Sequence, residues 1–570
     1  MKRKTIAWLI IFLFFLIILV GVASFLYLEI KQPVSLPSAA YLEIKLQGQV
    51  MDRAPVDLFS QMIMNIQPVS LHDLWVNLRK AKNDDRIRCV LFRMGPLVCD
   101  WGKVDEIREL VKEFQSSGKK VYFYLDELPE ADREYYLATS GDYIILHPLG
   151  WLGVNGVGGY IPFFKNTLDK LGIQVEVEHV EEYKTAYNTF TEKGFTPAHK
   201  EMMVSLTQDI FKEYISKAAS SRHLSEATYL ARLDQGFFQG EKAKEAGLVD
   251  KVLFPDELED LLKEDGRELK KVTLETYARV AEKTTGPYRG KRVAIVYAQG
   301  PIIAGESISS FMGGETVGRW LRRVREDNRV KAVILRVDSP GGSAVGSDYI
   351  WREVILTRKQ KPVVVSMSDV AGSGGYWISV GASKIVAHPQ TLTGSIGVLA
   401  AKFDLSNLYK NIGITAERLV SSEHADIYST FRPLSLEEKA RLKEEIRWTY
   451  DQFLLRTAEG RGQPKEVIDR LGRGRVWTGN QAKQVGLVDE LGGLTRALEI
   501  AKQLAGIPQD EQVKLDVWPK KVSLISLILG RRGEASSFSG RVALLNYQEI
   551  LKRLEGENVW AIMPFWQNLR

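Results

Sequence analysis

The sequence predicts an α/β protein in which one domain occurs twice in tandem behind an N-terminal transmembrane helix. Three observations lead to this fold class. Related segments return about 240 residues apart, too long a period for a short-repeat solenoid. Short β-branched runs alternate with helical segments, which is typical of βαβ units with a mostly parallel sheet. At the N-terminus, a basic cluster precedes a long uncharged run.

The N-terminal run predicts a retained membrane anchor. Basic residues at 2–4 precede an uncharged stretch from Thr5 to Leu28, and about 20 apolar residues are enough to span the hydrocarbon core. A cleavable signal peptide, the alternative, has a shorter apolar core and a small-residue cleavage site, of which 21–24 is a poor version. We therefore expect a cytoplasmic tip at 1–5, a transmembrane helix at 6–28 and the remaining chain outside the cytoplasm.

The composition excludes several classes of protein. A chain of 570 residues is too long for one core, and 45% hydrophobic with 26% charged residues is usual for globular domains. The net charge of +6 is small and basic residues are interspersed with acidic ones, so no nucleic-acid partner is expected. Cys89 and Cys99 form no CxxC or zinc spacing, and the seven histidines form no HExxH pair. We therefore expect neither a metal nor a cofactor.

The repeat defines the expected domain boundaries. The aligned pairs of segments are 86–93 with 329–336, 131–136 with 372–377, 144–148 with 385–389, 153–157 with 394–398, 183–190 with 424–431, and 244–250 with 483–489. Their offsets drift from 243 to 239 residues, as small loop insertions would produce. The expected parts are a first repeat at 40–255, a connection at 256–290, a second repeat at 291–510 and a C-terminal extension at 511–570.

Within the second repeat, strands and helices alternate before the pattern becomes helical. The expected strands are 293–297, 332–335 and 362–365, and the expected helices are 317–325, 348–358, 434–458 and 478–505. Beyond the repeat, the apolar run at 520–529 is too short to span a bilayer. It could pack on the body of the protein, pair protomers or lie on the membrane surface.

The two copies differ at the positions where a catalytic pair would stand. Ser373 aligns with Asp132, and Lys184 aligns with Ala425, both at an offset of 241 residues. A serine is therefore found only in the second copy and a lysine only in the first. This complementary pattern predicts a serine–lysine hydrolase whose site is assembled between the two copies.

Ser373 stands among glycines, directly after an expected strand. A serine at a strand-to-helix turn is a recurrent nucleophile geometry, and the alternative role is a helix N-cap. In another strand-to-helix turn, Gly341 and Gly342 could expose N–H groups as an oxyanion hole, although a plain tight turn would use the same residues. Ser395, which aligns with Val154, could supply a hydroxyl that orients the lysine amine.

Lys184 is the preferred base for this serine. A lysine can act as a base only if burial or nearby positive charge lowers its pKa toward neutrality. Glu181 and Glu182 would oppose that shift if they faced the amine, and a solvated lysine is the alternative. His424 is a weaker candidate for the base. His388 has a counterpart in the first copy, so we expect it to be a turn residue of the fold.

Together these motifs carry a family resemblance. The segments at 336–343, 369–379, 393–398 and 183–184 resemble the long, tandem form of the bacterial signal peptide peptidase SppA family. The similarity runs from the N-terminal anchor to about Ala505. It implies a fold like that of Clp protease and crotonase, with chains assembled as a dome-shaped homotetramer.

By the same resemblance, Ser373 is the nucleophile of a serine peptidase and Lys184 is its general base. Backbone N–H groups near Gly341–Gly342 and at Gly374 form the oxyanion hole, and Ser395 assists the lysine. No metal or cofactor takes part.

The resemblance also implies the function, which is degradation of signal peptides left in the membrane after preprotein cleavage and of other extended apolar peptides. The chain is then a single-pass protein of the bacterial inner membrane, with a cytoplasmic N-terminus and periplasmic catalytic domains. The first copy carries 94–99 in place of the glycine-rich segment around Asp338, so we expect no active serine there. Two other functions stay open: a crotonase-like enzyme acting on acyl thioesters, and a membrane scaffold without catalysis.

Overall fold

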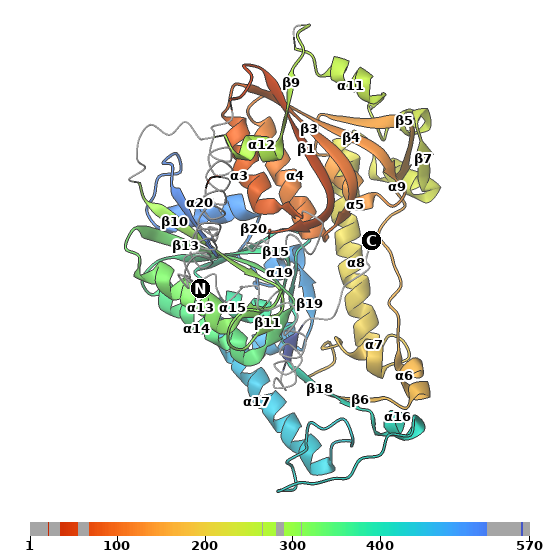
Figure 1. Cartoon of the computed structure of the whole chain (residues 1–570), viewed down its shortest axis with the longest axis vertical. Coiled ribbons are helices and arrows are strands. Elements are labelled where there is room, and N and C mark those ends of the chain that lie inside the picture. Colours follow the sequence, from red (N-terminus) through yellow and green to blue (C-terminus); the bar gives the residue numbers. More distant parts are fainter. Residues whose placement is uncertain are drawn as a thin grey trace, which may run out of the picture.

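The computed structural model shows two α/β copies stacked along the long axis of the molecule (Figure 1). The first copy forms most of the upper, red-to-yellow part and the second most of the lower, green-to-blue part. The structure describes residues 21, 35–54, 68–264, 266–280, 290–308, 310–520 and 560–562.

A mostly parallel sheet forms the centre of the first copy. Across the sheet, its strands are β2 (Val69–Ser70), β1 (Ala40–Met51), β3 (Ile87–Val98), β4 (Lys120–Leu128), β5 (Tyr143–Gly153) and β7 (Phe237–Gln239), with β8 (Lys251–Val252) beside β5 and β9 (Lys270–Thr273) beside β1. Only the pair of β5 and β7 is antiparallel among these strands of the described chain.

The second copy repeats this order. Its strands are β19 (Val476–Thr478), β17 (Leu392–Gly394), β15 (Val363–Gly372), β13 (Val330–Ser339), β10 (Arg292–Gln299) and β21 (Lys514–Trp518), with β16 (Lys384–Ala387) beside β15 and β20 (Glu490–Leu491) beside β16. The strands β10, β13 and β15 correspond to β1, β3 and β4. β21 pairs with β10 as β9 pairs with β1. Each copy therefore gains one strand from outside the predicted repeats: β9 comes from the connection at 256–290 and β21 from the C-terminal extension at 511–570.

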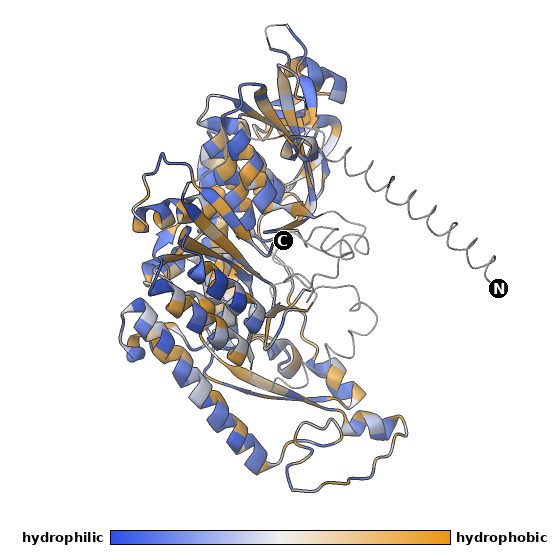
Figure 2. Cartoon of the chain, turned by 60° about the vertical axis from the view of Figure 1, so that its left-hand side comes forward, coloured by the Kyte–Doolittle hydropathy of each residue, from blue (hydrophilic) through white to orange (hydrophobic). Residues whose placement is uncertain are grey.

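Helices flank both sheets, and Figure 2 shows the hydrophobic colour concentrated in the strands between them. The helices of the first copy are α3 (Leu71–Lys82), α4 (Trp101–Gln115), α5 (Asp132–Ala138), α6 (Lys165–Leu171), α7 (Asn188–Thr191), α8 (Pro197–Ser221), α9 (Glu226–Gln235), α10 (Glu241–Glu245), α11 (Pro255–Leu261) and α12 (Leu274–Ala278). Those of the second are α13 (Gly314–Glu326), α14 (Ala344–Arg358), α15 (Gly374–Ser379), α16 (Ser406–Asn411), α17 (Leu436–Arg461), α18 (Lys465–Leu471), α19 (Gly479–Gln484) and α20 (Leu494–Leu504).

Most of the expected strands and helices are confirmed within a few residues, but the single helix predicted at 478–505 is wrong. The segment divides into α19, β20 and α20. Gly486 and Gly492 adopt φ values of +80° and +139° between these elements. Only glycine reaches such angles readily, so the helical pattern is interrupted where the chain turns back to pair β20 with β16.

One hydrophobic core joins the two copies. Apolar side chains on one face of the second sheet belong to the same buried cluster as the core of the first copy: Val293, Ile295, Ile334 and Val364. Helices α4 and α20 supply other members of this cluster. Because burial of apolar surface is the main favourable term in folding, the copies are held in a fixed relation.

A buried arginine crosses the same interface. Arg336 on β13 is 1% exposed, and its Nε lies 2.8 Å from Asp52 Oδ1 of the first copy. It also binds Glu106 on α4. The interface therefore contains a desolvated ion cluster as well as apolar side chains.

A third sheet also crosses between the copies. Its strands are β12 (Met312–Gly313), β11 (Ile302–Ile303), β14 (Gly341–Ser343), β22 (Trp560–Ile562), β18 (Leu399–Asp404) and β6 (Gln174–His179). β6 comes from the first copy and pairs antiparallel with β18 of the second along its whole length. This ladder fixes where the chain that follows β6 enters the second copy.

Within the part of the chain that the structure describes, no helix combines the length and the hydropathy needed to cross a bilayer. The tip and anchor expected at 1–5 and 6–28 lie outside that part, except for Gly21. The apolar run at 520–529 also lies outside it, except for Lys520.

Arg336→Met should destabilise the protein, because it leaves the Asp52 and Glu106 carboxylates buried without their cation. Removing one partner of a buried ion pair costs about 3–5 kcal/mol, and urea unfolding should show a loss of that order. The control is Arg329→Met, at a side chain that is 67% exposed beside Asp327, and it should change stability little. An equally small effect of both variants would contradict the assigned role of Arg336.

Candidate active site

Lys184 of the first copy and Ser373 of the second meet inside the molecule. Lys184 Nζ lies 2.8 Å from Ser373 Oγ, although 189 residues separate them in the chain. Both are buried, with exposed fractions of 1% and 0%. A base within hydrogen-bond reach of a hydroxyl is the arrangement that nucleophilic catalysis by serine requires.

Backbone pairing between the copies positions Lys184. The β6–β18 ladder is continued by Val180, whose N–H donates to Val398 O at 3.1 Å. Tyr183 N–H then donates to Arg473 O at 3.0 Å. These bonds hold the chain on both sides of residues 181–182. The Lys184 side chain, which follows, is therefore directed into the second copy.

Burial determines the protonation state of Lys184. Desolvation of the amine lowers its pKa well below the ordinary value of 10.5. The acidic neighbours face other partners: Glu181 binds Arg447 at 3.0 Å, and Glu182 binds Arg473 at 3.4 Å. The alternative of a solvated lysine is therefore wrong, and the neutral, proton-accepting amine is favoured.

Ser373 forms the tight turn between β15 and α15. Its φ of 53° and ψ of −111° are unusual for a residue with a side chain, and such backbone conformations persist where the surroundings enforce them. Ser373 occupies the N-cap position of α15, but its side chain makes no capping bond. Its Oγ instead lies near Lys184 Nζ and 3.3 Å from Gly397 O. The N-cap alternative is thus not the role of this hydroxyl.

Ser395 provides neutral oxygens around the amine. Its Oγ lies 3.0 Å and its carbonyl oxygen 3.2 Å from Lys184 Nζ. Its φ of 49° turns both groups toward the lysine. A neutral amine that donates its two N–H groups to these oxygens directs its one lone pair toward Ser373 Oγ.

The glycines predicted for an oxyanion hole lie in the neighbouring turn. β13 and β15 run parallel with Ser339 opposite Ala371, so the segments that follow them are adjacent. Gly341 and Gly342 have φ values of +100° and +149°, and they form the short strand β14 rather than a plain turn. Gly374 is the first residue of α15, where a backbone N–H has no acceptor within the helix.

A strand from the C-terminal region runs along these glycines. β22 pairs antiparallel with β14, with Ala561 opposite Gly342. It also pairs antiparallel with β18, where Trp560 lies opposite Leu399. An extended chain segment therefore fits between β14 and β18.

The first copy has different residues at the equivalent positions. Asp132, aligned with Ser373, accepts hydrogen bonds from Gly156 N–H at 3.0 Å and from the Tyr214 hydroxyl at 2.8 Å. Burial raises the pKa of this carboxyl. In the second copy, Ala425, which aligns with the lysine, is exposed. The serine–lysine pair is thus formed between the copies and is not duplicated at the aligned positions.

His424, the weaker candidate for the base, and His388, the expected turn residue, each lie near a glutamate carboxylate. His424 Nδ1 lies 3.1 Å from Glu438 Oε1. His388 is buried, with its Nε2 3.6 Å from Glu106 Oε2. The partner of the predicted nucleophile Ser373 is therefore Lys184 and not a histidine.

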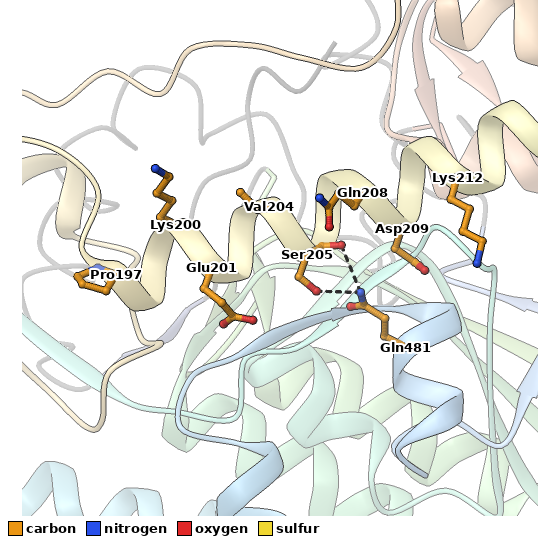
Figure 3. Close-up of a pocket in the computed structure, with 9 residues that line it drawn as sticks. All are labelled: Pro197, Lys200, Glu201, Val204, Ser205, Gln208, Asp209, Lys212 and Gln481. Atoms are coloured by element: carbon orange, nitrogen blue, oxygen red, sulfur yellow. Dashed lines mark hydrogen bonds between the residues drawn. The ribbon is translucent and has the colours of Figure 1, made fainter. Parts of the chain in front are cut away.

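An open hollow of about 830 Å³ lies along α8 at its contact with α19 (Figure 3). Gln481 Nε2 donates to Ser205 at 3.1 Å from Oγ and 3.3 Å from the carbonyl oxygen. The other lining residues are Pro197, Lys200, Glu201, Val204, Gln208, Asp209 and Lys212. Neither member of the serine–lysine pair lines this hollow, so it lies apart from that pair.

Comparison with known proteins identifies the family. The model of Peptidase family S49 matches residues 113–270 and 355–508, one stretch in each copy. The chain belongs to this family.

Relatives of this S49 peptidase match both copies. The chloroplastic serine protease SPPA of Arabidopsis thaliana is 34% identical over 485 residues, which cover 83% of this chain and 70% of the relative. Protease 4 of Haemophilus influenzae is 32% identical over 550 residues, with 91% and 88% covered. Protease 4 of Salmonella typhi is 30% identical over 548 residues, with 90% and 86% covered. The chain is therefore a serine protease.

Two glycines leave the space that Lys184 occupies, and the sequence did not predict this role for them. Gly474 has a φ of +86°, and an added Cβ would lie 2.4 Å from Lys184 N. A Cβ on Gly397 would lie 3.0 Å from Lys184 Cδ. Gly474 does stand in a glycine-rich turn between a helix and a strand, but nothing local connects that turn with a lysine of the other copy.

Lys184→Met should stabilise this S49 peptidase, and the gain should depend on pH. Between the lowered pKa of folded Lys184 and 10.5, the unfolded chain binds a proton that the folded chain does not, so wild-type stability rises with pH there. The advantage of Lys184→Met is therefore largest on the acidic side of this window and shrinks toward pH 10.5. Urea unfolding across the window measures it. Lys483→Met, at an exposed position, is the control, and a pH-independent advantage of Lys184→Met would contradict the argument.

Proposed function

We propose that this chain is a membrane-anchored serine endopeptidase that uses Ser373 and Lys184 as a catalytic dyad. Its proposed substrates are cleaved signal peptides and other extended apolar peptides. The observation that carries the proposal is the distance of 2.8 Å between a serine hydroxyl and a buried amine. Since no carboxylate is among the causes that shift the pKa of Lys184, the amine can accept the serine proton.

The proposed reaction has two acyl steps. Neutral Lys184 accepts the proton of Ser373 while Oγ attacks the peptide carbonyl carbon, and N–H groups near Gly341–Gly342 and at Gly374 stabilise the oxyanion. The peptide C–N bond then breaks, and the lysine gives its proton to the leaving amine. In the second step the lysine accepts a proton from water, and the hydroxide attacks the carbonyl carbon of the acyl ester. The bond from that carbon to Ser373 Oγ then breaks, and the lysine returns the proton to Oγ, which restores the serine and the neutral amine. Ser395 keeps the amine oriented throughout.

The position of β22 supports an extended substrate. Peptides that add to a strand edge are bound by main-chain hydrogen bonds, with side-chain pockets giving specificity. β22 lies in this way between β14 and β18, next to Gly341–Gly342. A substrate in the same place would have to be unfolded. The choice of signal peptides rests on the family resemblance of the sequence motifs.

The proposed location rests on the uncharged run at 6–28. A transmembrane helix formed by this run would hold the chain in the bacterial inner membrane. Its N-terminus would lie in the cytoplasm and both copies in the periplasm. We further propose a homotetramer, as in the family that the motifs resemble. An enclosed assembly tethered to the membrane would admit extended apolar peptides and exclude folded proteins.

Labelling with a fluorophosphonate probe tests the dyad. Wild type should be labelled, Ser373→Ala should not, and Lys184→Ala should react at least about 100-fold more slowly because it lacks the general base. His424→Ala is the matched control and should react like wild type. Cleavage of an extended apolar peptide should follow the same order.

Other outcomes separate the remaining functions. Labelling of Lys184→Ala at the wild-type rate would overturn the lysine as base. Wild type that is neither labelled nor able to cut the peptide would favour a scaffold. Hydrolysis of acyl thioesters without peptide cleavage would favour a crotonase-like enzyme.

Removal of β22 tests the proposed path of the peptide. A chain that ends at residue 559 should bind an extended apolar peptide with a several-fold lower KM and an unchanged kcat, because the peptide no longer competes with β22 for the edges of β14 and β18. A chain that ends at residue 562 retains β22 and is the control. Equal KM values for the two truncated chains would show that substrate does not use this place.

A further inference from the structure

A second buried lysine of the first copy reaches into the second copy. Lys103 lies in the first turn of α4 and is 4% exposed. Its Nζ lies 2.7 Å from Asp338 Oδ2 and 2.8 Å from Asp369 Oδ2. One cation of the first copy thus binds two carboxylates of the second.

These two aspartates stand just before the proposed catalytic turns. Asp338, near the end of β13, is three residues before Gly341. Asp369, near the end of β15, is four residues before Ser373. Asp338 Oδ1 also accepts the Val370 N–H at 3.3 Å. Fixing both carboxylates on one amine therefore fixes the oxyanion glycines relative to the nucleophile.

The start of α4 is fitted closely to β15. Asp369 accepts the backbone N–H groups of Lys103 at 2.6 Å and of Asp100 at 2.9 Å. Asp100, the N-cap residue of α4, makes no capping bond with its own side chain, so the helix is capped by the other copy. Gly102 permits this approach, since an added Cβ would lie 2.8 Å from Ser368 O.

Lys103 and Asp338 are each present in only one of the two copies, as Lys184 and Ser373 are. In this part of the repeat, at an offset of 243 residues, Lys103 aligns with Gly346 and Asp338 aligns with Gly95. The lysine is present only in the first copy and the aspartate only in the second. A contact between the copies explains this division, whereas a role within each copy would not.

We propose that Lys103 is a positioning residue for the peptidase reaction and ties the Gly341 turn to the Ser373 turn. The inference rests on the proposed function and concerns how the oxyanion glycines and the nucleophile are held relative to each other. Burial would lower the pKa of Lys103, but Asp338 and Asp369 raise it well above its ordinary value, so the side chain stays charged. Lys103 is therefore a fixed cation, and it leaves proton transfer to the dyad.

The test compares Lys103→Met with Glu106→Gln in the full chain. Glu106 is also a buried residue of α4 and binds Arg336, which precedes Asp338 on the same strand, so its loss weakens the interface without touching either turn. Lys103→Met should lower kcat for an extended apolar peptide by about 10- to 100-fold with KM within about twofold, since a misplacement of about 1 Å costs that much in rate. Glu106→Gln should lower Tm similarly and keep kcat within about threefold.

Two further measurements separate positioning from a general loss of stability. Lys103→Met leaves two buried carboxylates without their cation, so Asp338→Asn, which removes one charge and keeps the side-chain shape, is measured beside it. It should reproduce the loss of kcat with a Tm closer to that of wild type. The pH at which kcat/KM rises should stay the same in all variants, because burial sets the pKa of Lys184.

The inference is overturned if Lys103→Met and Asp338→Asn lose no more kcat than Glu106→Gln, or if the pH midpoint moves. Rates of labelling by the fluorophosphonate probe should fall in parallel with kcat. A wild-type protein that neither cuts the peptide nor reacts with the probe would overturn the proposed function itself.

Discussion

A buried amine that must stay neutral is the constraint on which the rest of this structure depends. Taking Lys184 out of water costs free energy whenever the amine is protonated, so the fold has to close the site around it and supply uncharged oxygens. Ser373 and Ser395 provide those oxygens at 2.8 and 3.0 Å. The lysine follows a strand of the first copy and both serines belong to turns of the second, so neither copy can build the site alone.

The interface between the copies is correspondingly built like a protein interior. One apolar cluster extends across it, and β6 continues a sheet of the other copy. Two cations buried in it, Arg336 and Lys103, are each bound by two carboxylates. A buried pair gives little net stability but demands one geometry. The Lys103 pairs therefore fix the turns of the second copy against the first, while the Arg336 pairs join the copies away from those turns.

Duplication allows this division of roles. The second copy retains the glycine-rich turns that leave room around Ser373, while the first fills its equivalent turn with Asp132 and hydrogen bonds to it. The first copy acts as support: it supplies the lysine on one side of the site and the start of α4 on the other. Its own turn then needs no space for a substrate.

The sequence by itself determined the α/β repeat, the two glycine-rich turns and the complementary serine and lysine, because alternation, turn chemistry and internal alignment are local patterns. Only the tertiary structure decided that Glu181 turns away from the amine, that Gly474 seats the lysine, and that the segment at 478–505 is not one helix. Each of these depends on a partner far away in the chain. The pKa of Lys184 belongs to the same group, since desolvation is a property of the packed interior and not of the residues beside it.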